Sequence, residues 1–347
     1  MNGCRLPVGV VLPTLNARPQ LPAHLAQMRT WADLVEEIVV VDSQSDDGTG
    51  EYLRTQLQHP FTRHFSRPRG LYQAWNYGVG QLQRKYTYIS TAGDLITREG
   101  LEHLVRTAER FNADVVVSPP RLVLEPGEQM PFKRWPIHEI IAQLGLASPA
   151  LLPRHAAFFY AAYYAVEQWL FGLLGSSASN LYRTTTLQQR LFPTDCGHAG
   201  DVFWAVRNAL QVALVVTPRE CSTFLIHPKT WNQGMDAFYT KLVWRALLEA
   251  RQVLQEESIR AALTPDGDQL LMISAYLDAL HCGHQAQVEL DGFRTAALPW
   301  VLRPLAWQAR RRRTAHRRRV ADLRARLRAT VAASVQAKPQ EAMVSAP

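Results

Sequence analysis

The sequence predicts an α/β fold built on a mostly parallel sheet, followed by a helical extension. Apolar runs of strand length alternate with segments of helical periodicity up to about residue 118, and the alternation then stops. The charge is uneven as well. Residues 300–347 hold eleven arginines and Lys338 against two acidic residues, a net +10, while the whole chain of 347 residues carries +8. The basic character therefore belongs to the C-terminal tail.

The expected elements of the first half follow one another as strand and helix. They are strands at Val8–Leu12, Glu37–Val41, Phe61–Phe65, Tyr86–Ser90 and Val115–Val117, with helices at Leu21–Leu34, 49–57, 71–82 and Leu101–Phe111 between them. The run from Ile38 to Val41 is continuously apolar, which suits a strand buried on both faces. Small polar residues at 45–49 suit a turn that caps the next helix.

Beyond Pro119-Pro120 the pattern is less regular. We expect no regular structure over 121–150, a strand at Leu210–Val216, and helices at Met235–Leu263 and Leu270–Leu280. The aromatic stretch 158–171 is more typical of a core than of a ligand site.

These observations divide the chain into three parts. We expect residues 1–230 to form one domain, divided into a first half (1–118) and a second half (119–230). Residues 231–333 form a helical extension that ends in a basic amphipathic tail, and 334–347 are disordered because they are small and polar.

Polar residues stand where the predicted strands end. Ligands of open parallel sheets bind at the carboxyl ends of the strands, so these residues are the candidate site. They are Thr14 and Asn16, Asp42, Arg69, and Thr91 with Asp94. A carboxylate at a strand end can accept hydrogen bonds from the base or ribose of a nucleotide, and the N–H groups at helix N-termini can bind phosphate. Neither G-x-G-x-x-G nor a G-x-x-x-x-G-K loop occurs, which disfavours a dehydrogenase or an NTPase.

Four motifs resemble those of family 2 glycosyltransferases of the GT-A fold. They are the opening strand at Val8–Asn16, the acidic second strand and D-G-T turn at Ile38–Thr49, the third-helix segment Gly70–Gly78 with Asn76, and Tyr88–Asp94 at the place of the metal-binding D-x-D. Their order and spacing carry the resemblance over residues 6–118, and it is patchy to about 230.

The resemblance implies a nucleotide-diphosphate sugar donor, a divalent metal and an inverting displacement. Thr14, Asn16, Asp42, Arg69, Asn76 and Thr91 would bind the donor. Asp94 would hold Mn²⁺ or Mg²⁺, hard cations that prefer oxygen ligands. Thr91 and Gly93 replace the usual aspartates, so the D-x-D motif is reduced to Asp94 and metal dependence stays open.

The resemblance makes residues 1–118 the nucleotide-binding half and residues 119–230 the acceptor half, with the acceptor site in two later segments. The resemblance assigns Gly175, Ser176, Ser177 and His198 to the acceptor and makes Asp201 the catalytic base, with Gly200 in place of the usual glutamate. Such a base typically contributes about 10²–10⁴-fold, because an alcohol is a poor nucleophile near pH 7. His227 stands where a late histidine completes the metal site in this fold.

Structural roles remain open for the same residues. Asp42 could end a turn, Asp94 could cap a helix, and Asp201 could be a first-turn acid favoured by the helix dipole. For Asp47 the capping role is the favoured one, and His198 and His227 have structural alternatives.

The tail offers a membrane interpretation. Trp300 and Trp307 lie beside Arg310–Arg313 and Arg317–Arg319, which suits an anionic membrane surface bound through residues 298–328. A solvated basic helix is the alternative, and nucleic acid is the least favoured partner.

Together these features predict an inverting glycosyltransferase that acts on a carbohydrate or lipid-linked acceptor hydroxyl, in bacterial surface polysaccharide or glycolipid synthesis. Four cysteines without metal-ligand spacing suit a cytoplasmic protein, peripheral at the inner face of the membrane. A nucleotidyltransferase and a non-catalytic nucleotide-sugar-binding module are the alternatives.

Overall fold

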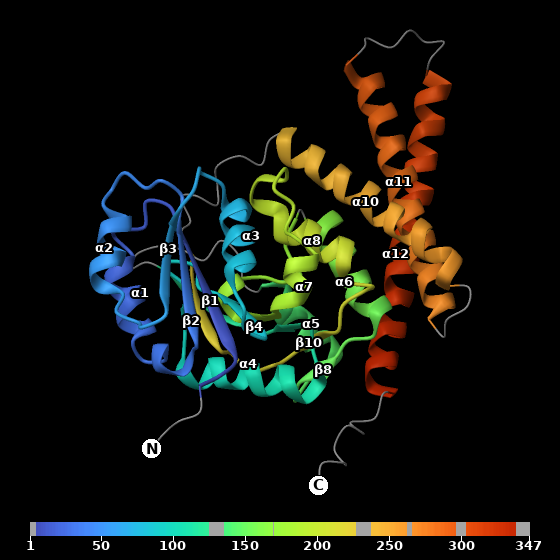
Figure 1. Cartoon of the computed structure of the whole chain (residues 1–347). Coiled ribbons are helices and arrows are strands. Elements are labelled where there is room, and N and C mark those ends of the chain that lie inside the picture. Colours follow the sequence, from blue (N-terminus) through green and yellow to red (C-terminus); the bar gives the residue numbers. More distant parts are fainter. Residues whose placement is uncertain are drawn as a thin grey trace.

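The computed structural model describes residues 5–124, 135–168, 170–226, 237–261, 266–295 and 303–337. It confirms the α/β fold: a twisted sheet is covered by helices on both faces, and a C-terminal group of helices lies beside it (Figure 1).

The main sheet has eight strands in the order β3-β2-β1-β4-β9-β6-β10-β8. Their bounds are β1 (Val8–Thr14), β2 (Glu37–Asp42), β3 (Thr62–Ser66), β4 (Tyr86–Ile89), β6 (Val115–Val117), β8 (Ala150–Leu151), β9 (Asn180–Arg183) and β10 (Leu214–Val216). The pairs among β1, β2, β3 and β4 are parallel, as is β6 with β10. β9 lies antiparallel between β4 and β6, so the acceptor half contributes a central strand.

A second sheet of three strands, β5-β11-β7, consists of β5 (Leu95–Ile96), β11 (Ser222–Ile226) and β7 (Pro120–Leu124). Its strands come from distant parts of the sequence. The expectation of irregular structure over 121–150 is wrong, because β7, helix α5 (Pro136–Leu144) and β8 lie there. β7 is stabilised by pairing with β11, about a hundred residues away, which local patterning does not reveal.

The helices around the sheet follow the strand–helix alternation closely. They are α1 (Leu21–Met28), α2 (Thr49–Gln56), α3 (Leu71–Gln81), α4 (Arg98–Phe111), α6 (Arg154–Val166), α7 (Thr184–Gln189) and α8 (Gly200–Asn208), with short 3-10 turns at Ala32–Leu34, Ser177–Ser179 and Gly197–Ala199. The helix expected at Leu21–Leu34 is thus an α-helix followed by a 3-10 turn.

The continuous apolar strands separate two cores. Val10 and Ile38, paired across β1 and β2, face one core, whereas Val11 and Val39 face the other, because side chains alternate along a strand. The described aromatic residues of α6 are buried in the second core, as expected of a core segment.

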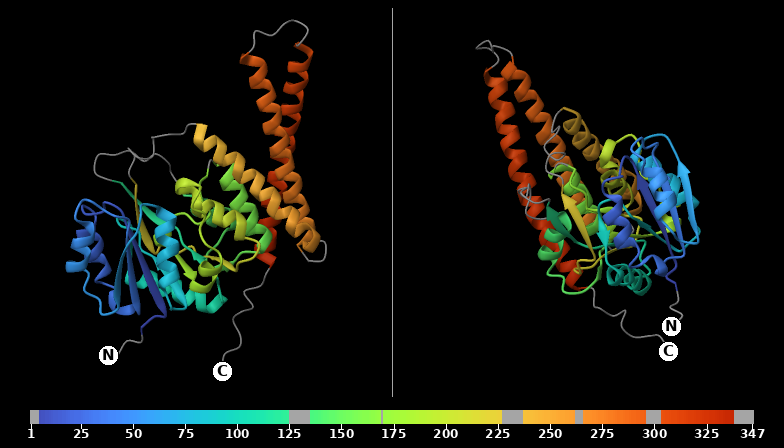
Figure 2. Two further views of the ribbon diagram at one scale, coloured as in Figure 1. Left: turned by 45° about the horizontal axis from the view of Figure 1, so that its top comes forward. Right: turned by 90° about the vertical axis from the view of Figure 1, so that its left-hand side faces the viewer.

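The C-terminal helices are α10 (Ala237–Ala261), α11 (Gly267–Thr295) and α12 (Arg303–Ala337). α11 and α12 pack side by side as a long antiparallel hairpin that projects from the domain (Figure 2). Residues 334–337, expected to be disordered, form the last turn of α12, where the Ser334 hydroxyl contacts His155. Residues 338–347 lie outside the described residues. No helix within the described ranges is apolar over a length that could cross a membrane.

Candidate active site

Asp42 is the centre of a hydrogen-bond network where β1 and β2 end. Thr14 and Asp42 are register partners at this edge. The Asp42 carboxylate accepts hydrogen bonds from the Thr14 hydroxyl at 2.9 Å, the Ser45 hydroxyl at 2.6 Å and the Ser45 N–H at 3.0 Å. Three donors from the protein itself hold this carboxylate in one orientation.

The loops after β1 and β2 are bonded to each other. Asn16 donates its N–H to the Ser45 hydroxyl at 2.9 Å, and its side-chain carbonyl accepts from the Asp46 N–H at 3.1 Å. Asp46 in turn forms a 3.1 Å ion pair with Arg69, which brings the end of β3 to the same place. Asp47 accepts from the N–H groups of Arg18 and Thr49, a capping role like the one favoured from the sequence.

Two cavities open at this edge. One, of about 240 Å³, lies between the β1 loop and the start of α3; Thr14, Asn16, Gly70 and Thr91 are among its lining residues. The other, of about 590 Å³, lies between β2, β3 and α2, with Asp42, Ser45 and Arg54 in its wall. Their combined size suits a nucleotide rather than an isolated ion.

Asp94 is a buried carboxylate after β4. Its two oxygens accept hydrogen bonds of 3.3 Å, one from the Leu225 N–H and one from the Ser176 hydroxyl. Burial raises the pKa of Asp94 to about 7, and these bonds oppose the rise. The Thr91 hydroxyl contacts the Ser177 hydroxyl at 2.5 Å, so the Gly175–Ser177 loop closes over the end of β4.

Asp201 begins α8 and is held by Tyr72 of α3. The Tyr72 hydroxyl lies 2.8 Å from Asp201 Oδ1 and 2.9 Å from the carbonyl oxygen of His198. Burial raises the pKa of Asp201 to about 6, against the lowering effect of the Tyr72 hydrogen bond. Burial and the Asp201 charge raise the pKa of Tyr72, so the phenol stays protonated and is the donor.

The glycine at position 200 has a steric reason. A Cβ there would lie 2.5 Å from the Tyr72 ring and 2.6 Å from the carbonyl oxygen of Pro193. A glutamate at this position would displace the tyrosine that holds Asp201. The glycine that stands at position 200 in place of the expected glutamate therefore leaves the space that the Tyr72 ring occupies.

A single loop borders both perturbed carboxylates. A Cβ on Gly172 would lie 3.4 Å from Asp201 Oδ2, and Ser176, four residues later, donates to Asp94. Gly175 in between has a positive φ of 59°, and a Cβ there would meet the Trp135 indole at 2.5 Å. Glycine at 175 is thus required for the fold of this loop.

Two candidate residues, Asn76 and His198, lie apart from this arrangement. Both amide atoms of Asn76 bind the backbone of Phe192, and Asn76 lines neither cavity. The His198 side chain is exposed, and its backbone carbonyl is what meets Tyr72. His227 lies outside the described residues.

Sequence reasoning missed Tyr72 and Ser45. Ser45 falls inside the D-G-T turn, so its place three residues after Asp42 could have indicated a bond to that carboxylate. Tyr72 and Asp201 are separated by 129 residues, and only the unusual Gly200 hinted that something bulky packs there.

The same fold occurs in solved glycosyltransferase structures. S. aureus TarS residues 1–349 in complex with UDP-GlcNAc is 14% identical over 87% of this chain and 79% of that one, with a TM-score of 0.53. The same protein with UDP is 15% identical over 91% and 90%, with a TM-score of 0.50. The Pyrobaculum calidifontis mannosyltransferase PcManGT in complex with GDP-Man and Mn²⁺ is 17% identical over 97% and 89%, with a TM-score of 0.47.

At such identities the likeness concerns the fold. No curated protein matches the chain significantly. The family model described as glycosyl transferase family 2 matches residues 9–166, which include Thr14, Asp42 and Asp94. The matched segment and the shared fold together support the family 2 glycosyltransferase resemblance carried by the strand-end motifs.

Proposed function

We propose that this chain is an inverting glycosyltransferase that moves a sugar from a nucleotide-diphosphate donor to an acceptor hydroxyl. One observation carries the proposal: two carboxyl groups with raised pKa values, Asp94 and Asp201, border the same short loop, and Asp94 follows Thr91, which lines the smaller cavity at the strand ends. Perturbed acids gathered in a cleft are typical of active sites.

The nucleoside of the donor would bind around Asp42. Its carboxylate is fixed by Thr14 and Ser45, and Asn16 and Arg69 belong to the same bonded loops. Arg69 would approach the diphosphate, and the N-terminus of α3 behind Gly70 offers N–H groups for an anion. Thr91 would contact the sugar side of the donor.

Asp94 would hold the divalent cation. The described residues contain no group of three or more His, Cys, Asp or Glu side chains that could hold a metal. The Asp94 carboxylate and the nearby hydroxyls of Ser176 and Ser177 are oxygen ligands, which suits Mg²⁺ or Mn²⁺ if the diphosphate of the sugar donor supplies further ligands. When bound, such a cation offsets the charge on the leaving diphosphate.

Asp201 would act as the base. Its carboxylate takes the proton of the acceptor hydroxyl while that oxygen bonds to the anomeric carbon and the bond from this carbon to the diphosphate oxygen breaks. Attack opposite the leaving group inverts the anomeric configuration. The Tyr72 hydrogen bond favours the ionised carboxylate and fixes its direction.

A thermal-shift screen tests the donor site. We expect UDP or GDP with Mn²⁺ to raise the Tm of the full chain, because a ligand that binds only the folded state stabilises it. Asp42→Asn should reduce this shift, while Asp33→Asn, at an exposed ion pair with Arg98, should not. No shift with any nucleoside diphosphate would contradict the proposal.

The same samples separate the alternatives. A nucleotidyltransferase needs no distal base, so turnover that survives Asp201→Asn would favour it. A non-catalytic binding module would give the thermal shift without donor hydrolysis or transfer to any acceptor.

We also propose that α12 binds an anionic membrane surface, where a lipid-linked or polysaccharide acceptor would be met. Residues 298–302 lie outside the described residues. Within α12, Leu305 and Trp307 are exposed, Arg311 lies over the Trp307 ring at 4.7 Å, and Arg310, Arg318 and Arg319 are exposed. Each basic residue near such a surface contributes about 1 kcal/mol.

Charge substitution is the suitable test, since Leu327 and Val331 of α12 are buried in the core and truncation would expose that core. Replacing Arg310, Arg311, Arg318 and Arg319 with glutamine should release the protein from vesicles containing anionic phosphatidylglycerol. Unchanged sedimentation with those vesicles would overturn the membrane proposal.

A further inference from the structure

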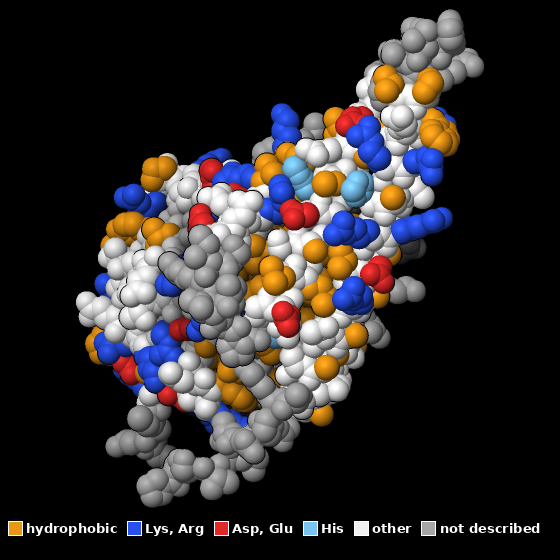
Figure 3. Space-filling model, turned by 90° about the vertical axis from the view of Figure 1, so that its right-hand side faces the viewer, with side chains coloured by type: hydrophobic (Ala, Val, Ile, Leu, Met, Phe, Trp, Pro, Cys, Tyr) orange, Lys and Arg blue, Asp and Glu red, His pale blue; other side chains and the backbone are white. Residues whose placement is uncertain are grey.

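A third cavity lies far from the strand ends in the fold, among the C-terminal helices. It has a volume of about 510 Å³ and is lined by the end of α6 together with α10, α11 and α12. Its size falls in the range of small-molecule sites. Figure 3 shows this side of the molecule, where Lys, Arg and His side chains lie among apolar residues over the helical region. None of the residues assigned to the proposed donor or acceptor sites lines it.

The cavity is rich in positive charge. Arg313, Arg317 and Arg324 line it, and Glu167 is the single carboxylate among the described lining residues. Arg324 forms an ion pair with Glu167, and the Tyr276 hydroxyl donates to the same carboxylate. The Glu167 carboxylate therefore already has two partners within the protein.

Four arginines on one face of α12 divide into two pairs. Positions 313, 317, 324 and 328 share this face, because they are separated by about whole turns. The pair nearer the C-terminus, Arg324 and Arg328, is called the lower pair and has partners in or directly after α6: Arg324 binds Glu167, and Arg328 donates to the Tyr163 hydroxyl at 2.8 Å. The upper pair, Arg313 and Arg317, forms no ion pair with any residue in the described part of the chain.

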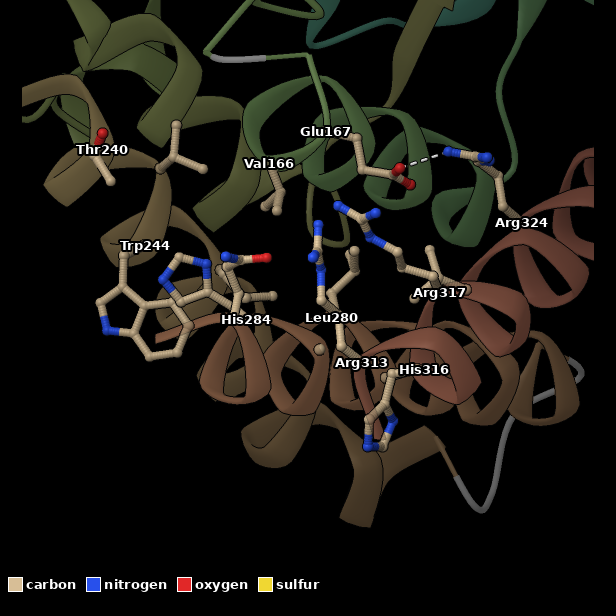
Figure 4. Close-up of a pocket in the computed structure, with 16 residues that line it drawn as sticks. Val166, Glu167, Thr240, Trp244, Leu280, His284, Arg313, His316, Arg317 and Arg324 are labelled. Atoms are coloured by element: carbon tan, nitrogen blue, oxygen red, sulfur yellow. Dashed lines mark hydrogen bonds and ion pairs between the residues drawn. The ribbon is translucent and has the colours of Figure 1, made fainter. Parts of the chain in front are cut away.

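Figure 4 shows how the upper pair lies. The guanidinium groups of Arg313 and Arg317 point into the same space, toward the end of α6 where Val166 and Glu167 lie, while His316 points away. The Nε atom of Arg313 is buried without a hydrogen-bond partner. The half-buried Arg313 thus leaves a donor unsatisfied, and the exposed Arg317 adds a second positive charge beside it, while the nearby Glu167 carboxylate is paired with Arg324; an anion bound between Arg313 and Arg317 would satisfy both groups.

We propose that this cavity binds a phosphate group, with Arg313 and Arg317 as its ligands. Guanidinium groups donate in pairs to phosphate oxygens, and a dianion would neutralise both charges at once. Thr240 on α10 adds a hydroxyl in the cavity wall. The rest of the wall is largely apolar, including Val243, Leu247 and Leu280, which suits an apolar chain attached to the phosphate.

Trp244 closes one side of the cavity. It stacks on His284 with ring centroids 4.4 Å apart and on His281 at 5.0 Å. Burial lowers the pKa of both histidines, so they are neutral at pH 7 and the charge of the site comes from the arginines. Recognition of phosphate should therefore persist at neutral and mildly basic pH.

The test is a binding titration of the full chain with two probes. Inorganic phosphate reports on the anion alone, and dihexanoyl phosphatidic acid, below its micelle concentration, adds short acyl chains. Tighter binding of the phosphatidic acid identifies a lipid phosphate, and equal binding identifies a soluble phosphate ester; both outcomes support the site. Dihexanoyl phosphatidylcholine is the zwitterionic comparison and should bind more weakly.

Paired variants make the test specific. Arg313→Gln with Arg317→Gln should weaken phosphate binding at least tenfold, whereas Arg312→Gln with Arg326→Gln, which removes the same charge from positions of α12 outside the cavity lining, should change it less than twofold. Equal losses in the two double variants, or no loss in the first, would overturn the proposal.

A second variant changes the cavity from another helix. Gln287→Glu on α11 keeps the side-chain size and adds a carboxylate among the lining residues, so it should also weaken phosphate binding. Nucleoside diphosphate binding at the strand ends should stay unchanged in all these variants, which separates this proposal from the proposed transferase function. Tighter phosphate binding by Gln287→Glu would contradict the assignment.

Discussion

The two sides of the candidate active site hold their carboxylates in different ways. Asp42, on the donor side, accepts three hydrogen bonds of 2.6–3.0 Å from Thr14 and Ser45. Asp94 and Asp201 accept two hydrogen bonds each, and burial raises their pKa values to about 7 and about 6. Under the proposed assignment, the difference means that Asp42 is held ready for recognition of the sugar donor, whereas Asp94 and Asp201 have the perturbed pKa values typical of groups that take part in chemistry.

The substitution Asp201→Asn should have the largest effect and tests whether Asp201 acts in chemistry rather than in donor binding. We expect kcat for sugar transfer to fall by about 10²–10⁴-fold while the donor Kd stays unchanged, since only proton removal is lost. Steady-state kinetics and a donor titration measure the two effects. Asp195→Asn is the matched control, because Asp195 is a nearby exposed carboxylate paired with Arg245. A variant that retains wild-type kcat would remove Asp201 from the mechanism.

Asp94→Asn should show the next largest effect. We expect donor binding in Mn²⁺ to weaken at least about tenfold, or 1.4 kcal/mol, and to become insensitive to EDTA, because the variant loses its anionic cation ligand. Calorimetric titrations with and without Mn²⁺ measure this. Asp42→Asn should instead weaken binding similarly under both conditions. If Asp94→Asn keeps the metal dependence, the cation is held elsewhere.

Tyr72→Phe tests the pH dependence. The Tyr72 hydroxyl donates to Asp201 and so lowers its pKa; its removal raises that pKa, and the base is then protonated to a higher pH. The acidic limb of the kcat profile, near pH 6 in the wild type, should move up by about one pH unit for the loss of one charge-assisted bond. At pH 8 the variant should approach the wild-type rate. A lower rate at every pH with an unmoved limb would indicate a positioning role only.

The smallest effect is expected on the donor side. Thr14→Val removes one of three donors to Asp42 and should weaken nucleotide binding by about threefold to tenfold. Thr14→Ser keeps the hydroxyl and should restore affinity. If Thr14→Val weakened binding as strongly as Asp94→Asn, the two sides would not differ in the way described above.

Local patterns predicted what depends on neighbouring residues. The parallel strands β1 and β2 follow from apolar runs, and Thr14, Asn16, Asp42 and Arg69 are brought together because they lie at or just after the carboxyl ends of the neighbouring parallel strands β1, β2 and β3. Asp94 was found by its place after β4. These features need no knowledge of distant contacts.

The features that sequence reasoning missed depend on long-range packing. The antiparallel β9 pairs with β4 and β6, and β7 pairs with β11, so neither shows a distinctive local pattern. The Tyr72–Asp201 contact joins two segments that no motif connects. Asn76 stands at a motif position, yet its amide binds the Phe192 backbone, and its role in the donor site stays a prediction.

The position of β9 has a consequence for anyone who wishes to dissect or recombine this protein. A fragment that stops at residue 118 retains β4 and β6 but lacks the strand between them, so two hydrophobic edges in the middle of the sheet would be left open for intermolecular pairing. Expression of the donor half alone should therefore yield aggregates. Chimaeras that exchange acceptor specificity between relatives have to transfer β9 together with the loop before it, or keep both from the same parent.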